Sequence, residues 1–500
     1  MGSREGETVP RKGLKLLRMR KRNGGMANGS HGEQAGEEPL SPASRLFHEP
    51  SCNCYVIAIM GSAMKIDVDV LKAGLERTLL RHPRFSSIQE FSEGELGRWI
   101  PTEVVLDDHC VIPVVDPDMA DPDQFVEDYV ASLTKTSMDM SKPLWEFHAV
   151  NVKTSEAEAV AILRAHHSLG DGTSLISLLL ACTRKTSDPH SLPTISVVKR
   201  PMIKGAGFLA FMATTWMLLR VALNTIMDVF LFLATYLFLK DTETVFKGAE
   251  GVEFHPKRIV HRTLELDDFK LIKSELDTTI NDVMLGVISA GLSRYLSKTT
   301  FSEDGSTKEQ RILPRNILVR AAVLVNIRPT PGLHVMATMM EKRSTGSQWG
   351  NWLGYVLLPF PMVIYEDPLD YVRKAKAIAD RKKLSLESLF TFASSALLVS
   401  TLGIKAAAAL SHRVLCNTTL SFSNLAGPAE ELSFAGHPMT FLAPSVYGHP
   451  HALTVHFQSY MDKVKMVLAV DEEAIPDPRQ LLEDAADSLR LIKDAVLSRR

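Results

Sequence analysis

Apolar and polar positions along the chain follow two periodicities, and these predict strands and helices in turn. Residues 55–60, 147–152 and 159–165 are short runs typical of strands, and the last is almost wholly apolar, as expected of a strand buried in a sheet. Apolar residues recur instead at helical spacing, behind candidate capping aspartates, at Val68, Leu71, Leu75 and Leu79. The first part of the chain therefore predicts a mixture of strands and helices.

A second series of elements begins at residue 259. Apolar spacing predicts a helix at 281–296 and a terminal helix at 477–497. The strands expected in this part are 259–266, 321–327, 352–358, 418–422, 453–459 and 464–470. Because strands and helices alternate in both parts, the pattern favours an α/β architecture over a helical bundle or a β-sandwich.

Between the two parts lies a strongly apolar stretch, residues 205–239, which follows a linker rich in Pro, Ser, Thr and Lys. Its charges are Arg220 and Asp228, and each would cost about 2.5–3.5 kcal/mol at the centre of a membrane. Neither flank alone reaches the roughly 20 residues that a spanning helix needs. The aromatic residues of the stretch favour contact with lipid over the alternative, a buried core helix.

The N-terminal residues are polar and rich in glycine, and they predict a disordered arm over 1–39. Lysines, arginines and leucines are interleaved between Arg11 and Arg22, so the arm is either solvated or lies on an anionic membrane surface. The predicted organisation is this arm, an N-terminal half at 40–182, a linker with the apolar insert at 183–258, and a C-terminal half at 259–500.

Composition narrows the function classes without choosing one. The formal net charge is −2 at pH 7, so the chain lacks the basic surplus that nucleic-acid binding requires, and no such partner is expected. The five cysteines are odd in number and widely spread, which fits a reducing compartment. Cys52 and Cys54 have no matching second pair, so neither a zinc site nor a cofactor is expected.

The chemically informative stretch is His166-His167-Ser168-Leu169-Gly170-Asp171-Gly172, which follows the buried run at 159–165. A hydroxyl group is a poor nucleophile until its proton is removed, and a neutral histidine can remove it near pH 7. Strand alternation sends the side chains of His166 and His167 to opposite faces, which disfavours a shared metal. We therefore predict a catalytic group of His167 as general base, with His166 and Asp171, on a turn that Gly172 helps to shape.

This motif and several further blocks resemble the wax ester synthase/diacylglycerol acyltransferases, in particular their plant members. The resemblance runs from about Leu40 to the C-terminus. The further blocks are Pro143-Leu144-Trp145-Glu146, Asn281-Asp282, Asn326-Ile327-Arg328-Pro329, Gly350-Asn351 and Ser423-Asn424-x-x-Gly427-Pro428. The histidine motif alone is shared with chloramphenicol acetyltransferase-like enzymes, plant alcohol acyltransferases and peptide-synthetase condensation domains. The other blocks and the apolar insert select the lipid-ester branch.

The resemblance implies an α/β fold of two chloramphenicol acetyltransferase-like halves with the active site in a central channel. It also implies two substrates: acyl-coenzyme A from one side, and a long-chain alcohol or diacylglycerol from the other. His167 then deprotonates this acceptor for direct attack on the thioester. Asp171 serves architecture, and Arg328 is its candidate partner, unless Arg328 is a surface residue beside a proline turn.

Other residues of these blocks receive supporting roles. Asn281 is expected to hold the substrate or the developing oxyanion, or else to cap a helix. Ser423 and Asn424 are expected to shape a loop that crosses between the halves.

The order of these residues constrains the topology. His167 precedes the apolar insert and Asn281 follows it, so a single membrane crossing would place the two halves on opposite sides. We expect instead a re-entrant hairpin or an amphipathic pair in the membrane interface, with Arg220 and Asp228 near the turn. The expected location is the endoplasmic reticulum membrane, with the plasma membrane as a further location, and both halves facing the cytosol. A soluble alcohol or amine acyltransferase and a non-catalytic lipid-binding scaffold stay open as other readings.

Overall fold

A mixed sheet of seven strands is built around the apolar runs of the N-terminal half, in the order β5-β6-β7-β2-β14-β13-β8. The structure, a computed structural model, describes residues 38–91, 97–116, 118–194, 208–302, 313–314, 316–328 and 349–499, all in one contact unit. The strands of this sheet are β2 (Tyr55–Ser62), β5 (Cys110–Val111), β6 (Trp145–Val150), β7 (Ala159–His166), β8 (Thr183–Lys185), β13 (Leu432–Phe434) and β14 (His437–Tyr447). Three helices bury apolar residues against this sheet: α2 (Val68–Arg77), α3 (Pro122–Leu133) and α4 (Gly172–Cys182).

A short sheet and a helix lie at the N-terminal edge of this half. They are β1 (Glu38–Pro39), β3 (Ser87–Glu90), β4 (Arg98–Pro101) and α1 (Pro42–Leu46). The last two residues of the predicted arm at 1–39 therefore form a strand, and its other residues lie outside the described part of the chain.

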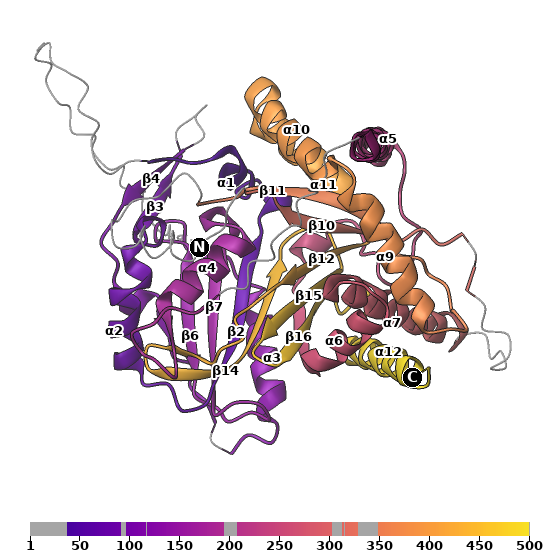
Figure 1. The fold of residues 1–500 in the computed structure, drawn as a ribbon. Coiled ribbons are helices and arrows are strands. Elements are labelled where there is room, and N and C mark those ends of the chain that lie inside the picture. Colours follow the sequence, from indigo (N-terminus) through magenta and orange to yellow (C-terminus); the bar gives the residue numbers. More distant parts are fainter. Residues whose placement is uncertain are drawn as a thin grey trace, which may run out of the picture. The chain divides into compact units, whose positions relative to one another are not determined.

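The second large sheet has six strands in the order β11-β10-β12-β15-β16-β9. Its strands are β9 (Arg258–Glu265), β10 (Arg320–Asn326), β11 (Leu353–Pro359), β12 (Leu420–Leu425), β15 (Leu453–Tyr460) and β16 (Lys463–Val470). Four helices form a core with one face of it: α6 (Leu266–Glu275), α7 (Ile280–Ser302), α9 (Leu369–Lys383) and α12 (Pro478–Leu497). Figure 1 shows these helices gathered on the same side as the C-terminus.

The opposite face of this sheet is covered at one edge by α5 (Phe208–Leu237), α10 (Glu387–Leu402) and α11 (Ile404–Cys416). Strand alternation divides the two cores, because Ala321 and Leu358 face the first set of helices while Ala322 and Leu357 face the second. In Figure 1, α5 is seen end on beside α10 and α11.

The two sheets are joined by a strand that changes sides. β14 follows β12 in the chain but pairs antiparallel with β2, with Tyr447 opposite Tyr55. Residues 432–447 therefore lie in the first sheet, although they come late in the predicted half at 259–500. β14 also contacts β15 and β16, so this crossing sets the first sheet, which includes β2 and β7, against the second.

The apolar insert is one continuous helix, so the predicted hairpin or amphipathic pair is wrong. Residues 208–237 contain neither proline nor glycine, and nothing in their sequence breaks the helix. Asp228 does not mark a turn, because its carboxylate is buried in ion pairs with Arg381 and Lys382. Among the described residues, α5 is the one single helix long and apolar enough to cross a membrane.

Candidate active site

His167 lies in the turn that connects β7 of the first sheet to α4. β7 ends at His166, and residues His167–Leu169 form one turn of 3₁₀ helix before α4 begins. The backbone N–H of His167 donates to the carbonyl of Cys54 at 2.9 Å, and its ring stacks on Phe47 with 4.2 Å between centroids. The side chain is 3% exposed, so the turn holds the imidazole in a fixed, dry position.

Two cavities meet at this imidazole. The larger has a volume of about 370 Å³ and a mostly apolar wall that includes Phe47, Cys52, Leu353, Tyr355, Phe392 and Leu415. The smaller has a volume of about 150 Å³, and its wall includes Leu163, Gly172, Leu175, Leu179, Asn424 and Leu425. The residues common to both walls are His167, Leu324, Leu353, Ser423, Val446 and His456. A reaction at His167 can therefore receive one substrate from each side.

Burial keeps His167 in the form that accepts a proton. The loss of water around the ring lowers the pKa of His167 below its ordinary value of 6.5, and the nearby Asp171 carboxylate opposes this shift only in part. Its Nδ1 is buried and has no hydrogen-bond partner on any other described residue. A neutral imidazole with a lowered pKa is available as a base at pH 7.

Asp171 and Arg328 form the contact that the motif predicts. The two guanidinium nitrogens of Arg328 donate to the two oxygens of Asp171, at 3.1 and 2.6 Å. The same carboxylate accepts from the backbone N–H of Ser174, which caps α4, and from the N–H of Trp352. Asp171 therefore ties the turn after His167 to β11 and to the end of β10, and its side chain lines neither cavity.

His166 is turned away from both cavities. The Ser168 hydroxyl lies 2.7 Å from Nδ1, and the Nε2 atom lies 2.9 Å from the side-chain oxygen of Asn53. Gln89 in turn donates to the Ser168 hydroxyl. With both ring nitrogens engaged, His166 is placed to brace the turn rather than to meet a substrate.

The other predicted residues divide into two groups. Gly172, Ser423 and Asn424 do line the cavities, and Ser423 lies on β12 rather than on a crossing loop. Asn281 is not part of either cavity wall. Its neighbour Asp282 is buried and accepts from the N–H of Thr279, as in a capping box at the start of α7.

Two further residues of the site, Asn351 and His456, receive no role from the sequence. The Asn351 amide donates to the backbone carbonyl of His167 at 3.0 Å. The Gly350-Asn351 block is the sequence signal that could have pointed to this residue. His456 lies on β15 opposite Ser423 on β12, and no local motif surrounds it. Burial, reinforced by the nearby His167, lowers the pKa of His456 to about 4, so this ring is neutral as well.

The site offers no metal-ligand set. Among the described residues, His255, Asp471 and Glu473 form the one group with suitable spacing, and all three lie outside both cavity walls. Lys257 lies 3.7 Å from the Asp471 carboxylate and already supplies it with a cation.

Comparisons with known proteins agree with this geometry. Residues 66–284 match the family model of the wax ester synthase/diacylglycerol acyltransferase catalytic domain, and residues 349–493 match the WS/DGAT C-terminal domain. Two Arabidopsis thaliana proteins, wax ester synthase/diacylglycerol acyltransferases 11 and 5, are 49% and 46% identical to this chain. The first alignment covers 93% of this chain and 97% of the relative, and the second covers 97% and 99%.

Solved structures confirm the predicted fold of two acetyltransferase-like halves. A wax ester synthase/diacylglycerol acyltransferase from Marinobacter aquaeolei VT8 gives a TM-score of 0.59 at 16% identity, over 92% of this chain and 99% of that one. The first condensation domain of the calcium-dependent antibiotic synthetase gives 0.55 at 11% identity, over 93% and 97%.

Proposed function

The chain belongs to the wax ester synthase/diacylglycerol acyltransferase family, and we propose that it transfers a long-chain acyl group from acyl-coenzyme A to a long-chain alcohol, diacylglycerol or both. It is an acyltransferase, as its close relatives are named. The observation that carries the finer proposal is the position of His167 at the junction of two largely apolar cavities.

In the proposed reaction, the neutral His167 takes the proton of the acceptor hydroxyl. The hydroxyl oxygen attacks the thioester carbonyl, and the ester forms as the carbon–sulfur bond breaks. The imidazolium then returns its proton to the leaving thiolate, which leaves as coenzyme A. No external oxidant or cofactor enters this balance.

Direct attack is proposed because Ser168, Cys52 and Cys54 are poor nucleophiles. The Ser168 hydroxyl is fully buried between His166 and Gln89. Cys52 and Cys54 line the larger cavity, but burial raises the pKa of Cys52 to about 11 and that of Cys54 well above its usual range. Both thiols therefore stay protonated at pH 7, and a covalent acyl-enzyme is not favoured.

His456 is the proposed donor to the thioester carbonyl oxygen. It lines both cavities from the second sheet, opposite the base from the first. A neutral imidazole carries one N–H, and the buried Nδ1 of His456 has no partner among the described residues. A fixed donor in a dry site stabilises negative charge on that oxygen more strongly than water does.

We also propose that α5 and α10 rest on a membrane. Exposed apolar side chains on α5 include Phe208, Leu209, Phe211, Trp216, Leu219, Ile226 and Phe230. Leu389, Leu397 and Leu402 on α10 are exposed as well, while Phe392 of the same helix lines the larger cavity. An apolar face of this size is typical of a lipid contact, and it lies on the wall through which a lipid acceptor would enter. The proposed location is the cytosolic side of the endoplasmic reticulum, or the plasma membrane.

The direct test is product identification. Membranes from cells that produce the protein receive labelled acyl-coenzyme A with either a long-chain alcohol or diacylglycerol, and the esters are identified by mass. The His167→Ala protein is the matched control. Formation of a wax ester or a triacylglycerol that depends on His167 supports the proposal, and formation of neither ester refutes it.

A further inference from the structure

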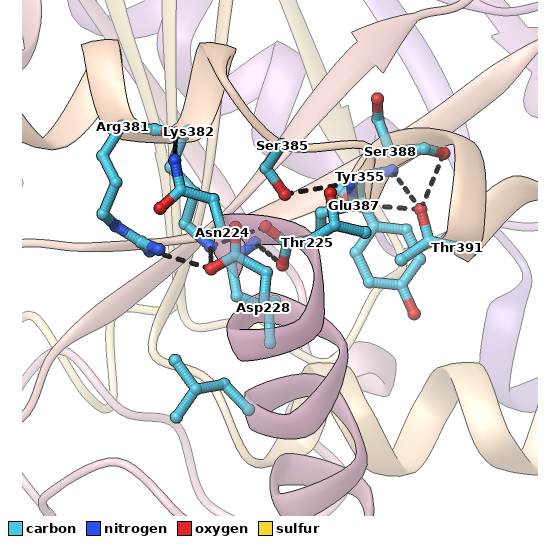
Figure 2. Close-up of polar contacts among 12 residues, drawn as sticks. Asn224, Thr225, Asp228, Tyr355, Arg381, Lys382, Ser385, Glu387, Ser388 and Thr391 are labelled. Carbon is cyan, nitrogen blue, oxygen red and sulfur yellow. Dashed lines mark hydrogen bonds and ion pairs between the residues drawn. The ribbon is translucent and has the colours of Figure 1, made fainter. Parts of the chain in front are cut away.

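The buried side of α5 is polar at its middle, in contrast to the rest of the helix. Asn224, Thr225 and Asp228 lie on one face, since Asp228 follows the other two by four and three residues, about one helical turn. Figure 2 shows all three pointing at the corner where α9 ends and α10 begins. The two helices are bent by 51° at this corner.

This face of α5 adds hydrogen bonds to those that the corner makes within itself. The Asn224 amide donates to the carbonyl oxygens of Arg381 and Leu384, at 3.3 and 3.0 Å, at the C-terminal end of α9. The Thr225 hydroxyl accepts from the N–H of Leu386 at 3.0 Å, just before α10, which has no side-chain cap of its own. The Leu384 carbonyl and the Leu386 N–H, at the two helix ends, are therefore paired from a third helix.

A buried chain of charges extends the contact into the sheet (Figure 2). Asp228 accepts from Lys382 at 2.9 Å, Lys382 donates to Glu387 at 2.5 Å, and Glu387 accepts from the N–H of Leu357 in β11 at 3.0 Å. Asp228 and Glu387 are at most 1% exposed. Removal of one member of such a chain leaves a buried charge uncompensated.

α10, in turn, is a wall of the larger cavity. Thr391, Phe392, Ser395 and Ala396 line that cavity from α10. The N-terminal end of α10 is fastened to β11 where Tyr355 N–H donates to the Thr391 hydroxyl at 3.0 Å. The two elements are so close at Gly354 that a Cβ there would meet the Ser388 carbonyl at 2.0 Å. The position of α10 thus depends on β11 from one side and on α5 from the other.

We propose that Asn224, Thr225 and Asp228 are positioning residues: the seating of α5 on the α9–α10 corner holds α10 in place and so sets the width of the larger cavity. The helix that carries the apolar outer face would then also shape the chamber behind it. That this chamber holds an acyl or alcohol chain rests on the proposed function.

The native cysteines provide a test that needs no turnover. Cys52 and Cys54 line the larger cavity, whereas Cys110 and Cys182 lie in the first core and line neither cavity. All four are similarly buried, between 6% and 8% exposed. The rate at which a maleimide modifies each thiol, mapped by mass spectrometry on the full chain in detergent, reports on its local exposure.

We expect Asp228→Asn and Thr225→Val to raise the labelling rates of Cys52 and Cys54 about tenfold, with Cys110 and Cys182 unchanged. Met227→Ala, on the exposed face of the same helix, is the matched control and should change none of the four rates. Unchanged labelling rates at Cys52 and Cys54 in both the Asp228→Asn and the Thr225→Val protein would overturn the proposal. An equal rise at all four cysteines would overturn it too, since that pattern reports loss of the whole fold.

Kinetics separate this proposal from the proposed function. In the Asp228→Asn and Thr225→Val proteins, KM for a long-chain acceptor should rise several-fold more than KM for a short one. The kcat for the short acceptor should stay unchanged. If neither acceptor reacts even with the wild-type protein, the proposed function fails while the labelling result still stands.

Discussion

Asp171 and Arg328 form a buried, bidentate ion pair, although they lie 157 positions apart in the chain. Asp171 belongs to the turn after His167, and Arg328 follows β10 in the other sheet. Arg328 also donates to the carbonyl of Gly350 and to the Ser174 hydroxyl. The contact therefore fixes the catalytic turn against the second sheet rather than touching a substrate.

We expect Asp171→Ala to lower the free energy of unfolding by about 3–5 kcal/mol, because it leaves the Arg328 guanidinium buried without a counter-charge. Arg328→Lys should cost less, since it keeps the charge and loses only the paired geometry. Urea unfolding followed by circular dichroism measures both. An Asp171→Ala protein as stable as the wild type would show that the ion pair does not contribute to the free energy of unfolding.

The base can be separated from its neighbour by paired substitutions. His167→Ala should lower kcat about 10²- to 10⁴-fold without a large change in melting temperature, since general-base catalysis contributes that much. His166→Ala should lose less activity but more stability, because its ring bridges Ser168 and Asn53. Equal activity losses in the two variants, at equal stability, would contradict the assignment of the base.

Much of the fold follows from the sequence where the signal is local. The buried strands were predicted within one or two residues, as at β7 and β16, since their apolar runs are continuous. β14 is not among the predicted strands, and its place in the first sheet could not be predicted either, because which strand pairs with which is decided by contacts distant in sequence. The hairpin expected at 205–239 is wrong, because the chain stays helical through both charges and one of them, Asp228, pairs with Arg381 and Lys382 of α9.

The site shows the same division. His167, Asp171 and Gly172 come from one contiguous motif, so sequence spacing places them together. The pairing of Arg328 with Asp171, expected from the fit of a guanidinium to a carboxylate, is confirmed by their contact. His456 carries no motif, and only the register of β15 against β12 brings it to the cavities.

A pair of neighbours in α7 tests the two roles expected of Asn281, in substrate binding or in capping the helix. Asp282→Ala should lower stability by about 1 kcal/mol, because its carboxylate satisfies the N–H of Thr279 at the helix start. Its kcat should be unchanged, and Asn281→Ala should change neither quantity much. Melting temperatures and initial rates on the same preparations give the answer. A large kcat loss in Asn281→Ala alone would restore it to the site.

Buried neutral histidines should make the fold sensitive to acid. Burial lowers the pKa of His82 and of His451 to about 3, and that of His456 to about 4. Between about pH 6.5 and 4 the unfolded chain binds protons at these positions and the native state does not, so stability falls as pH falls. Each such group adds a slope of up to about 1.4 kcal/mol per pH unit.

Urea unfolding at pH 7.5, 6.0 and 5.0 measures this slope. His82→Phe should make it shallower, whereas replacement of the exposed His190 should not. Stability that stays level or rises toward pH 5 would contradict the prediction.

The last prediction concerns the proposed contact of α5 with a membrane. Its C-terminal part is docked on the catalytic unit through Asp228, through Asn417, which donates to the Thr235 carbonyl, and through Arg413, which donates to the Tyr236 carbonyl. The undocked part, residues 208–220, is about 20 Å long at 1.5 Å per residue, whereas the hydrocarbon core of a bilayer is about 30 Å thick. α5 can therefore enter one leaflet but cannot cross while it stays docked.

Both sheets should accordingly stand on the same side of the membrane. We expect protease tags placed at residue 190 and at the C-terminus to be cleaved equally in sealed endoplasmic reticulum vesicles, with a lumenal marker protected. Asp228→Lys sets like charges against Arg381 and Lys382, and so should release the helix while the outer apolar face is kept. If one tag is protected and the other cleaved in the wild-type protein, α5 crosses the membrane, and the docked arrangement of α5 on α9 cannot be the one that exists there.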